Sequence, residues 1–358
     1  MKVLMVGLGG VGQRHLRNLR TLMPKNLQVV AYRVRKSPAV ISNVLTIEEG
    51  VSLEEKYGIR TYPDLQKALE EGPQIAFITN PSSLHIPVAL EAAKAGCHLF
   101  IEKPLSDSLN GVEELIATVE RNRLVAVVGY QLRFHPCLGW IRELLKAEAI
   151  GHLLAVRLEV GEHLPSWHLY EDYRQMYAAR KALGGGVVLS QIHEMDYAYS
   201  LFGMPRRVFA VGGKLSRLEI DVEDTASILM ECQWNGNVLP VHLHQDFLQK
   251  PPSRRCEIVG DAGKIVWDYY GGTLTIWRAA QKEPEVRRLE RFERNQLFLN
   301  EVKHFLACVH GEEKPLVALR DGANSLKIAL AAKQSLETGE IVPLQEYEPL
   351  RTEVSFHE

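Results

Sequence analysis

The sequence predicts an α/β protein with an N-terminal, doubly wound parallel sheet and a C-terminal α+β domain that holds a large, mainly antiparallel open sheet. Over residues 1–130, short apolar runs alternate with helical patterns, which is typical of parallel βαβ units. Closely spaced strands separated by turns follow in the second half. The 358 residues exceed the about 250–300 at which single cores stop growing, so we expect two domains, at 1–133 and 134–358.

The first fifteen residues carry the strongest local pattern. Residues 3–6 are an apolar run typical of a buried strand, the pattern G-x-G-x-x-G follows at once, and a helix with a leucine stripe ends at Pro24. A strand before and a helix after are the context in which this pattern binds a dinucleotide through the N–H groups of the helix start. A plain glycine-rich turn is the alternative. We expect a Rossmann-type site in which the pyrophosphate lies on Gly7, Gly9, Gly10, Val11 and Gly12.

The second predicted strand, residues 27–32, ends without the carboxylate that an NAD enzyme places on the ribose 2′-hydroxyl. Three cations, Arg33, Arg35 and Lys36, stand there instead. The arginine fork can donate two parallel hydrogen bonds to a phosphate. We therefore expect Arg33 and Arg35 to bind the adenosine ribose or its phosphate, which favours NADP over NAD, although a solvated loop would show the same charges.

Three further buried strands are predicted at residues 74–79, 98–101 and 124–128, with helices between them. Asn110 is expected to cap the helix that ends near Asn122. The carboxyl ends of parallel strands meet at one edge of the sheet, where ligands bind. The residues at these ends should therefore line one crevice together with the glycine turn, and we expect them to contact the cofactor: Thr79, Asn80, Pro81, His85, Glu102, Lys103 and Gln131.

Composition argues against several classes of protein. The net charge of −2 gives no basic excess for nucleic acid, and no apolar run approaches the about 18 residues of a membrane span. The opening apolar run is too short and too rich in glycine for a signal peptide. The five cysteines are scattered and contain no C-x-x-C pair, which argues against a disulfide framework and a zinc site. We expect a cytoplasmic protein.

An ordered set of motifs runs through nearly the whole chain and is similar to that of the Gfo/Idh/MocA oxidoreductases. After the glycine turn and His15 come, in order, Thr79-Asn80-Pro81 with His85, Ala95-Gly96-Cys97-His98, Glu102-Lys103-Pro104, Arg133-Phe134-His135-Pro136, Gly184-Gly185-Gly186 before His193-Glu194-x-Asp196, Pro251-Pro252-Ser253-Arg254, Gly260-x-x-Gly263 and Thr338-Gly339.

The resemblance implies an NAD(P)-dependent dehydrogenase or reductase that passes a hydride between a nicotinamide cofactor and a hydroxyl-bearing carbon of a sugar, an inositol or a sugar nucleotide. Lys103 matches the family's E-K-P lysine, which would polarise the reacting oxygen; a surface lysine is the alternative. A cis bond before Pro104 would aim Lys103 into the crevice. His193 matches the family's general acid/base, and the glycine triplet would let a substrate approach the helix start.

One departure concerns the acid that many family members carry shortly before this histidine. Residues 188–192 contain Ser190 but no carboxylate, so either Asp196 or Asp246 serves, or His193 works unaided. The missing acid supports one alternative, a non-catalytic nucleotide-binding sensor or scaffold of the same fold. The resemblance leaves a second one open, a redox-assisted glycosidase like some members of the family.

A polar, aromatic-rich segment at residues 161–183 is predicted to form the substrate wall, with a loop packed on the sheet as the alternative. Tyr173-Arg174-x-x-Tyr177 is similar to a subset of the family associated with nucleotide sugars and surface-polysaccharide sugars. We expect a small, sugar-like substrate to contact Arg133, Trp167, Tyr173, Arg174, Ser190 and His193.

The second half contains closely spaced strands, predicted at residues 152–160, 208–211, 226–234, 238–244, 256–259, 264–268 and 274–278. The open sheet needs cover on its far face, which predicts a homodimer or homotetramer formed through this sheet. His242 and His244 share a strand face without a third ligand at metal spacing, so no metal site is expected. In this family the last helices, 300–309 and 325–337, return to brace the first domain.

Overall fold

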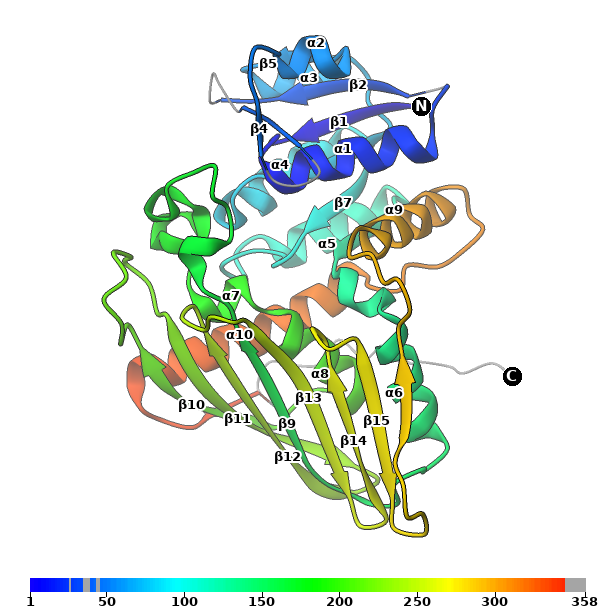
Figure 1. Cartoon of the computed structure of the whole chain (residues 1–358). Helices are drawn as coiled ribbons and strands as arrows, with labels where there is room; N and C mark the ends of the chain where they lie inside the picture. Colours follow the sequence, from blue (N-terminus) through cyan, green and yellow to red (C-terminus); the bar gives the residue numbers. More distant parts are fainter. Residues whose placement is uncertain (26, 35–38, 43–45, 345–358) are drawn as a thin grey trace.

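The computed structural model describes residues 1–25, 27–34, 39–42 and 46–344, which form two large sheets joined by C-terminal helices (Figure 1). The first sheet has six strands in the order β5-β2-β1-β6-β7-β8, and every neighbouring pair is parallel. Its strands are β1 (Lys2–Val6), β2 (Gln28–Tyr32), β5 (Arg60–Tyr62), β6 (Ile75–Ile78), β7 (His98–Glu102) and β8 (Ala126–Gly129). The predicted parallel sheet is confirmed.

Five helices connect these strands: α1 (Gly10–Leu22), α2 (Leu53–Tyr57), α3 (Leu65–Glu70), α4 (His85–Lys94) and α5 (Val112–Arg121). Strand β5 was not predicted, and neither was the short hairpin of β3 (Val40–Ile41) and β4 (Ile47–Glu48). The hairpin lies along α1, since the backbone N–H of Ile41 donates to Gln13 Oε1 at 2.7 Å.

The expected cap of α5 at Asn110 is wrong. The N-cap is Gly111, with φ at 75° and no side-chain hydrogen bond. A Cβ on Gly111 would lie 2.9 Å from Ile86 Cγ2, so the packing of α5 on α4 and the positive φ both require glycine there.

The second sheet has nine strands in the order β16-β15-β14-β13-β9-β12-β11-β10-β17, all antiparallel except the neighbours β9 and β12. This confirms the predicted, mainly antiparallel open sheet. Its strands are β9 (Leu153–Gly161), β10 (Arg207–Gly213), β11 (Thr225–Trp234), β12 (Asn237–Asp246), β13 (Ser253–Gly260), β14 (Gly263–Asp268), β15 (Thr273–Arg278), β16 (Glu285–Arg288) and β17 (Val342–Pro343).

The remaining short elements are α6 (Pro136–Lys146), α7 (Val187–Ser190), α8 (His193–Phe202) and the 3₁₀ turns η1 (Ser82–Leu84), η2 (Gln131–Phe134), η3 (Leu164–Ser166), η4 (Tyr173–Gln175), η5 (Tyr177–Ala179) and η6 (Lys181–Leu183). Helices α8 and α10 (Leu319–Thr338) pack on one face of the nine-stranded sheet (Figure 1). None of the described helices combines the length and the apolar character needed to cross a membrane.

The C-terminal helices contact both sheets. Phe305 of α9 (Asn295–Val309) packs edge-on against Phe77 and Phe100 of the first sheet, with ring centroids 5.7 and 5.6 Å apart. Ser335 of α10 accepts a hydrogen bond from the backbone of Ala210 in the second sheet at 2.9 Å. Both helices begin several residues before the expected positions. They join the two sheets, and the segments that follow β7 and β8 lie against α7 and α8, where Lys103 bonds Ser190 and Gln131 lies beside His193.

Candidate active site

The glycine turn after β1 has the close contacts that its sequence pattern predicts. Gly7 has φ at 83°, and a Cβ on Gly12 would lie only 2.5 Å from the Gly7 carbonyl oxygen, so the turn and α1 approach each other in a way that only glycine allows. A Cβ on Gly9, in contrast, would meet no atom within 4 Å. The backbone is therefore open at Gly9, where a phosphate would approach the start of α1.

Tyr170 lies over this turn. A Cβ on Gly10 would be 2.7 Å from the Tyr170 hydroxyl, which is buried and has no hydrogen-bond partner. Tyr170 belongs to the aromatic segment of residues 161–183, so this segment contacts the glycine turn before α1. An orphaned hydroxyl beside an open helix N-terminus suits a phosphate oxygen as its acceptor, so these residues fit a dinucleotide.

Side chains at the end of β6 hold the glycine turn and the neighbouring loop. The Thr79 hydroxyl lies within hydrogen-bond distance of the Val6 and Gly7 carbonyl oxygens, at 2.9 and 2.8 Å. The two ring nitrogens of His85 lie 2.9 Å from the Pro104 carbonyl oxygen and 2.8 Å from that of Asn80. Both side chains, predicted to contact the cofactor, thus have bonds within the protein that set the shape of the crevice. Pro81 follows Asn80 in the same loop, as the N-cap of η1.

Glu102, at the end of β7, forms a buried pair with His15 of α1, with Oε1 and Nε2 2.5 Å apart. Burial opposes ionisation, but the hydrogen bond to His15 and the charges of His15 and Lys103 bring the pKa of Glu102 below its ordinary value. The other carboxylate oxygen accepts the Lys103 N–H at 3.2 Å. The peptide bond between Lys103 and Pro104 is cis, as expected.

Lys103 and His193 come together at the ends of β7 and β8. The Lys103 ammonium donates to the Ser190 carbonyl oxygen at 2.5 Å, three residues before His193. The carboxamide nitrogen of Gln131 lies 3.1 Å from His193 Nε2, and His193 Nδ1 is buried without a partner. Burial, reinforced by the charges of Lys103, Arg254 and Arg294, holds the pKa of His193 well below its ordinary value. The imidazole is therefore neutral at pH 7, with one nitrogen available.

Both candidates for the missing acid already have partners. Asp196 accepts two hydrogen bonds from the Arg133 guanidinium, at 2.6 and 3.0 Å, and one from Ser325 at 3.0 Å. Asp246 accepts from the Leu248 N–H at 2.7 Å and lies 3.2 Å from His244 Nε2. Arg133, predicted to contact the substrate, is thus buried in a pair that joins η2 to α8.

Four charged and phenolic groups near His193 were missed by sequence reasoning. Arg254 Nε lies 2.9 Å from Glu194 Oε1, although the two are not aligned as a hydrogen bond, and burial raises the pKa of Glu194 to about 7. The Tyr270 hydroxyl donates to Glu162 at 2.7 Å. Glu194 and Arg254 each occur in a motif of the sequence. No local signal indicates that they form a pair, because Glu194 lies on α8 and Arg254 on β13.

The expectation that the glycine triplet opens the helix start to a substrate is wrong. Gly186 has φ at 105°, and its Cβ would lie 2.2 Å from Glu223 Oε1. A Cβ on Gly185 would lie 2.4 Å from the Tyr177 carbonyl oxygen. The glycines let the Tyr177 backbone and the Glu223 side chain pack closely against the start of α7. Glu223 Oε1 also accepts the Val188 N–H at 3.3 Å.

The predicted substrate wall divides into two parts. The Trp167 ring packs edge-on against Phe247 at 5.4 Å, and its indole N–H is buried without a partner. Tyr173 and Arg174 instead bond residues of the outer loops: the Tyr173 hydroxyl accepts the Glu219 N–H at 3.3 Å, and Arg174 pairs with Asp172 and Glu219. The structure does not bring these two side chains into contact with His193.

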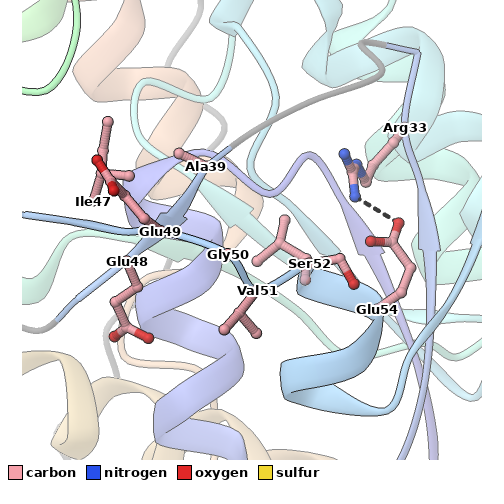
Figure 2. A pocket seen from close by; sticks show the side chains of 10 residues that line it. Arg33, Ala39, Ile47, Glu48, Glu49, Gly50, Val51, Ser52 and Glu54 are labelled. Carbon is pink, nitrogen blue, oxygen red and sulfur yellow. Dashed lines mark hydrogen bonds and ion pairs between the residues drawn. The ribbon is translucent and has the colours of Figure 1, made fainter.

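Beyond β2, Arg33 lines a cavity of about 320 Å³ together with Ala39 and residues 47–54. Figure 2 shows its guanidinium pointing to Glu54 of α2, where Nη1 and Oε1 lie 2.8 Å apart. Arg35 and Lys36 lie outside the described residues. Across the described ranges, no cluster of three His, Cys, Asp or Glu side chains could hold a metal ion.

Comparisons with known proteins agree with this architecture. Residues 1–130 match the family model described as "Oxidoreductase family, NAD-binding Rossmann fold", and residues 140–266 match the "GFO/IDH/MocA C-terminal domain". The chain is 27% identical to myo-inositol 2-dehydrogenase of Thermotoga maritima, over 97% of this chain and 99% of the relative. It is 23% identical to scyllo-inositol 2-dehydrogenase (NAD(+)) of Bacillus subtilis, over 96% of both chains.

Among solved structures, the WlbA dehydrogenase from Bordetella pertussis, in complex with NADH and UDP-GlcNAcA, superposes with a TM-score of 0.77 at 19% identity. The match covers 96% of this chain and 98% of that one, and at this identity it supports the fold alone.

Proposed function

The chain belongs to the GFO/IDH/MocA oxidoreductases, and on this premise we propose that it transfers a hydride between a nicotinamide coenzyme and the hydroxyl-bearing carbon of a sugar, an inositol or a sugar nucleotide. One observation carries the proposal. The Lys103 ammonium and the His193 imidazole meet at the carboxyl ends of the parallel strands, beside an open glycine turn.

Lys103 binds and polarises the reacting oxygen. An ammonium has three N–H donors, so Lys103 can keep its bond to the Ser190 carbonyl and still donate to a substrate oxygen. The bound nicotinamide ring supplies or takes up the hydride. As alkoxide character grows on the substrate oxygen, the fixed positive charge of Lys103 stabilises it.

His193 carries the proton at Nδ1, its free ring nitrogen. In the oxidation direction the neutral imidazole accepts the hydroxyl proton of the substrate. For Nδ1 to accept the proton, Nε2 must carry the other ring proton, so the Gln131 carboxamide presents its oxygen to Nε2 in both protonation states of His193. Nothing in this arrangement requires the missing acid near Ser190.

The remaining predicted site residues divide by their contacts. Ser190 Oγ and Trp167 Nε1 are buried without partners, which supports a substrate-binding role for both. Arg133 would act as a positioning residue, through its pair with Asp196. Tyr173 and Arg174 remain predictions, and their bonds to Glu219 would have to open for them to reach a substrate.

The preference between NAD and NADP depends on the pair of Arg33 and Glu54. Arg33 favours a 2′-phosphate, but the carboxylate 2.8 Å away repels one and suits the 2′-hydroxyl of NAD. NADP is favoured if the guanidinium turns from Glu54 to the phosphate. Because Glu54 is part-exposed, the difference is small, and both coenzymes should bind.

We expect a cytoplasmic homodimer or homotetramer that pairs through the nine-stranded sheet. Val211, Leu229 and Val238 are exposed on neighbouring strands of this sheet, which supports self-association. All five cysteines are buried free thiols, as suits a reducing compartment. Light scattering during gel filtration measures the oligomeric state, and a monomer at micromolar concentration would contradict the expectation.

Fluorescence titration with NADH and NADPH, followed by absorbance assays at 340 nm with inositols, sugars and sugar nucleotides, tests the proposal. We expect coenzyme binding and coenzyme reduction by at least one member of this panel. A chain that binds coenzyme but turns over nothing would support the sensor alternative. Release of nitrophenol from a nitrophenyl glycoside without coenzyme turnover would support the glycosidase.

A further inference from the structure

A carboxylate at the end of β9 has no role in the mechanism described above. Glu162 directly follows this strand, and its side chain is part-exposed. Its Oε1 accepts the Tyr270 hydroxyl at 2.7 Å, whereas Oε2 has no hydrogen bond to the residues that the structure describes. One carboxylate oxygen is therefore held in place by the protein, and the other can accept a hydrogen bond from a ligand.

Hydrogen bonds place Glu162 beside the reacting centre. The Asp246 carbonyl oxygen accepts both the Glu162 N–H and the Gln191 carboxamide nitrogen, each at 3.1 Å. Gln191 directly follows the serine that bonds Lys103, and it lies two residues before His193. The chain at Glu162 therefore lies against the turn between α7 and α8, which carries the reacting imidazole.

The register of β9 and β13 gives the direction of the Glu162 side chain. Val160 of β9 pairs with Arg254 of β13, and both side chains are buried. Arg254 Nε lies 2.9 Å from Oε1 of Glu194 on α8, so this face of the sheet is the one against α8. Because side chains alternate along a strand, Glu162 continues the face of Val160 and points to the same side as the helix that begins at His193.

The Glu162 carboxyl is ionised. Burial opposes ionisation, but the charge of Arg254, the hydrogen bond from Tyr270 and the charges of Arg294 and Lys103 together bring the pKa of Glu162 below its ordinary value. An ionised carboxylate accepts hydrogen bonds and repels other anions. Its free oxygen therefore suits a hydroxyl donor and disfavours an acid group.

We propose that Glu162 is a substrate-binding residue, which accepts a hydrogen bond from a second hydroxyl group of the substrate, other than the one that reacts, and that Tyr270 positions it. The inference rests on the proposed function for its reaction, but its binding test requires no turnover. A polyol with at least two free hydroxyl groups is therefore the preferred substrate, and one with an acid group at this place is disfavoured.

Isothermal titration of the NADH-loaded protein with myo-inositol, D-glucose and UDP-N-acetylglucosamine tests the proposal. NADH cannot accept a hydride, so an alcohol bound beside it is not oxidised and binding is measured alone. We expect at least one of these polyols to bind, and Glu162→Gln to weaken its binding at least about tenfold, because a charge-assisted hydrogen bond is lost. Binding of none of them, or the same Kd in the variant, would overturn the proposal.

Two controls separate the binding role from a structural one. The Kd of Glu162→Gln for NADH should stay within about twofold of the wild-type value. Glu290→Gln, the same charge change at an exposed position, should alter neither Kd. Weaker NADH binding in Glu162→Gln would assign this carboxylate to the coenzyme site and overturn the inference.

The role of Tyr270 is tested by a double-mutant cycle. Tyr270→Phe should weaken binding of the same polyol about threefold, and it should have no further effect in the Glu162→Gln background, because it acts through that carboxylate. Additive effects would contradict the positioning role. Binding that depends on Glu162 without any oxidation by NAD would count against the proposed function alone, whereas oxidation with binding that ignores Glu162 would overturn the inference alone.

Discussion

The candidate site has two sides, called walls here, which differ in how their polar groups are bonded. On the wall formed by the ends of the parallel strands, most of them bond another part of the protein: Thr79 bonds the glycine turn, His85 joins two loops, and Glu102 holds His15. These bonds exist before any ligand arrives. This wall therefore has its shape in advance, as a coenzyme site requires.

On the facing wall, several buried polar atoms have no partner: His193 Nδ1, Ser190 Oγ, Trp167 Nε1 and the Tyr170 hydroxyl. An unpaired buried polar group costs about 1–3 kcal/mol, so this wall gains most when a ligand supplies the missing bonds. The difference indicates that rigidity and ligand chemistry are divided between the two walls. Lys103 spans them, because it lies on the first wall and bonds Ser190 on the second.

Replacement of Lys103, which links the two walls, should have the largest effect on turnover. Lys103→Met removes the donor that stabilises developing alkoxide charge, and we expect kcat to fall about 10²–10³-fold. The Kd for NAD should stay within twofold, because the first wall keeps its bonds. Steady-state kinetics and fluorescence titration measure the two effects, with the exposed Lys94→Met as control. Loss of coenzyme binding together with turnover would place Lys103 in the coenzyme site instead.

On the second wall, His193→Gln should lower the oxidation rate about 10²-fold or more, because general-base catalysis is lost. Since burial holds the pKa of His193 well below its usual value, the wild-type base stays neutral as the pH falls. The wild-type rate should therefore be flat around pH 7 and decline only below the ordinary titration range of histidine. The variant should not show this decline of the rate at low pH. An unchanged decline would mean that another group causes it.

Glu301, on α9, should affect stability rather than catalysis. It is fully buried on α9, neither carboxylate oxygen has a partner, and burial raises its pKa well above the ordinary value. The folded state thus binds a proton that the unfolded state releases, so stability is lost as the pH rises from the ordinary glutamate value toward the raised one. Each unit of this difference is worth about 1.4 kcal/mol.

Glu301→Gln should therefore be more stable than the wild type at pH 8, by at least about 2 °C in Tm, and by less at pH 5. Thermal unfolding at the two pH values measures this, with the exposed Glu312→Gln as control. A Tm difference that does not depend on pH would show that the Glu301 carboxyl has a partner.

The smallest effect is expected in the cavity beyond β2. Glu54→Gln removes the carboxylate beside Arg33, so the ratio of the Kd values for NAD and NADP should shift toward NADP by up to about fivefold, the limit for an exposed pair. Glu49→Gln, which lines the same cavity, is the control. A shift toward NAD would mean that Arg33 does not reach the 2′-phosphate.

The parts of the molecule that could be predicted from the sequence depend on local signals. Apolar runs that alternate with helical stripes identified the parallel sheet, and the glycine spacing identified the turn that α1 packs against. The cis bond at Pro104 and the convergence of Lys103 and His193 followed from ordered motifs. The strand, helix and glycine signals each occupy a few consecutive residues, whose geometry depends little on the rest of the chain. The meeting of Lys103 and His193 is not local, and only the resemblance to the family implied it.

The parts that could not be predicted depend on pairs formed across the fold. Arg133 and Asp196 are 63 residues apart, and nothing near either residue specifies the other. The space beside Gly186 is occupied by the Glu223 carboxylate, which lies on another segment. At Asn110 the local capping signal was misleading, because the contact of Gly111 with Ile86 outweighs the gain from an asparagine cap.

A crystal structure of the chain with NAD bound tests the division between the two walls most directly. We expect the pyrophosphate on the backbone of Gly9–Gly12, the Tyr170 hydroxyl bonded to it, and the nicotinamide ring facing the gap between Lys103 and His193. The bonds of Thr79, His85 and Glu102 should be unchanged. A ring that lies away from this gap, or a first wall that rearranges on binding, would contradict the account.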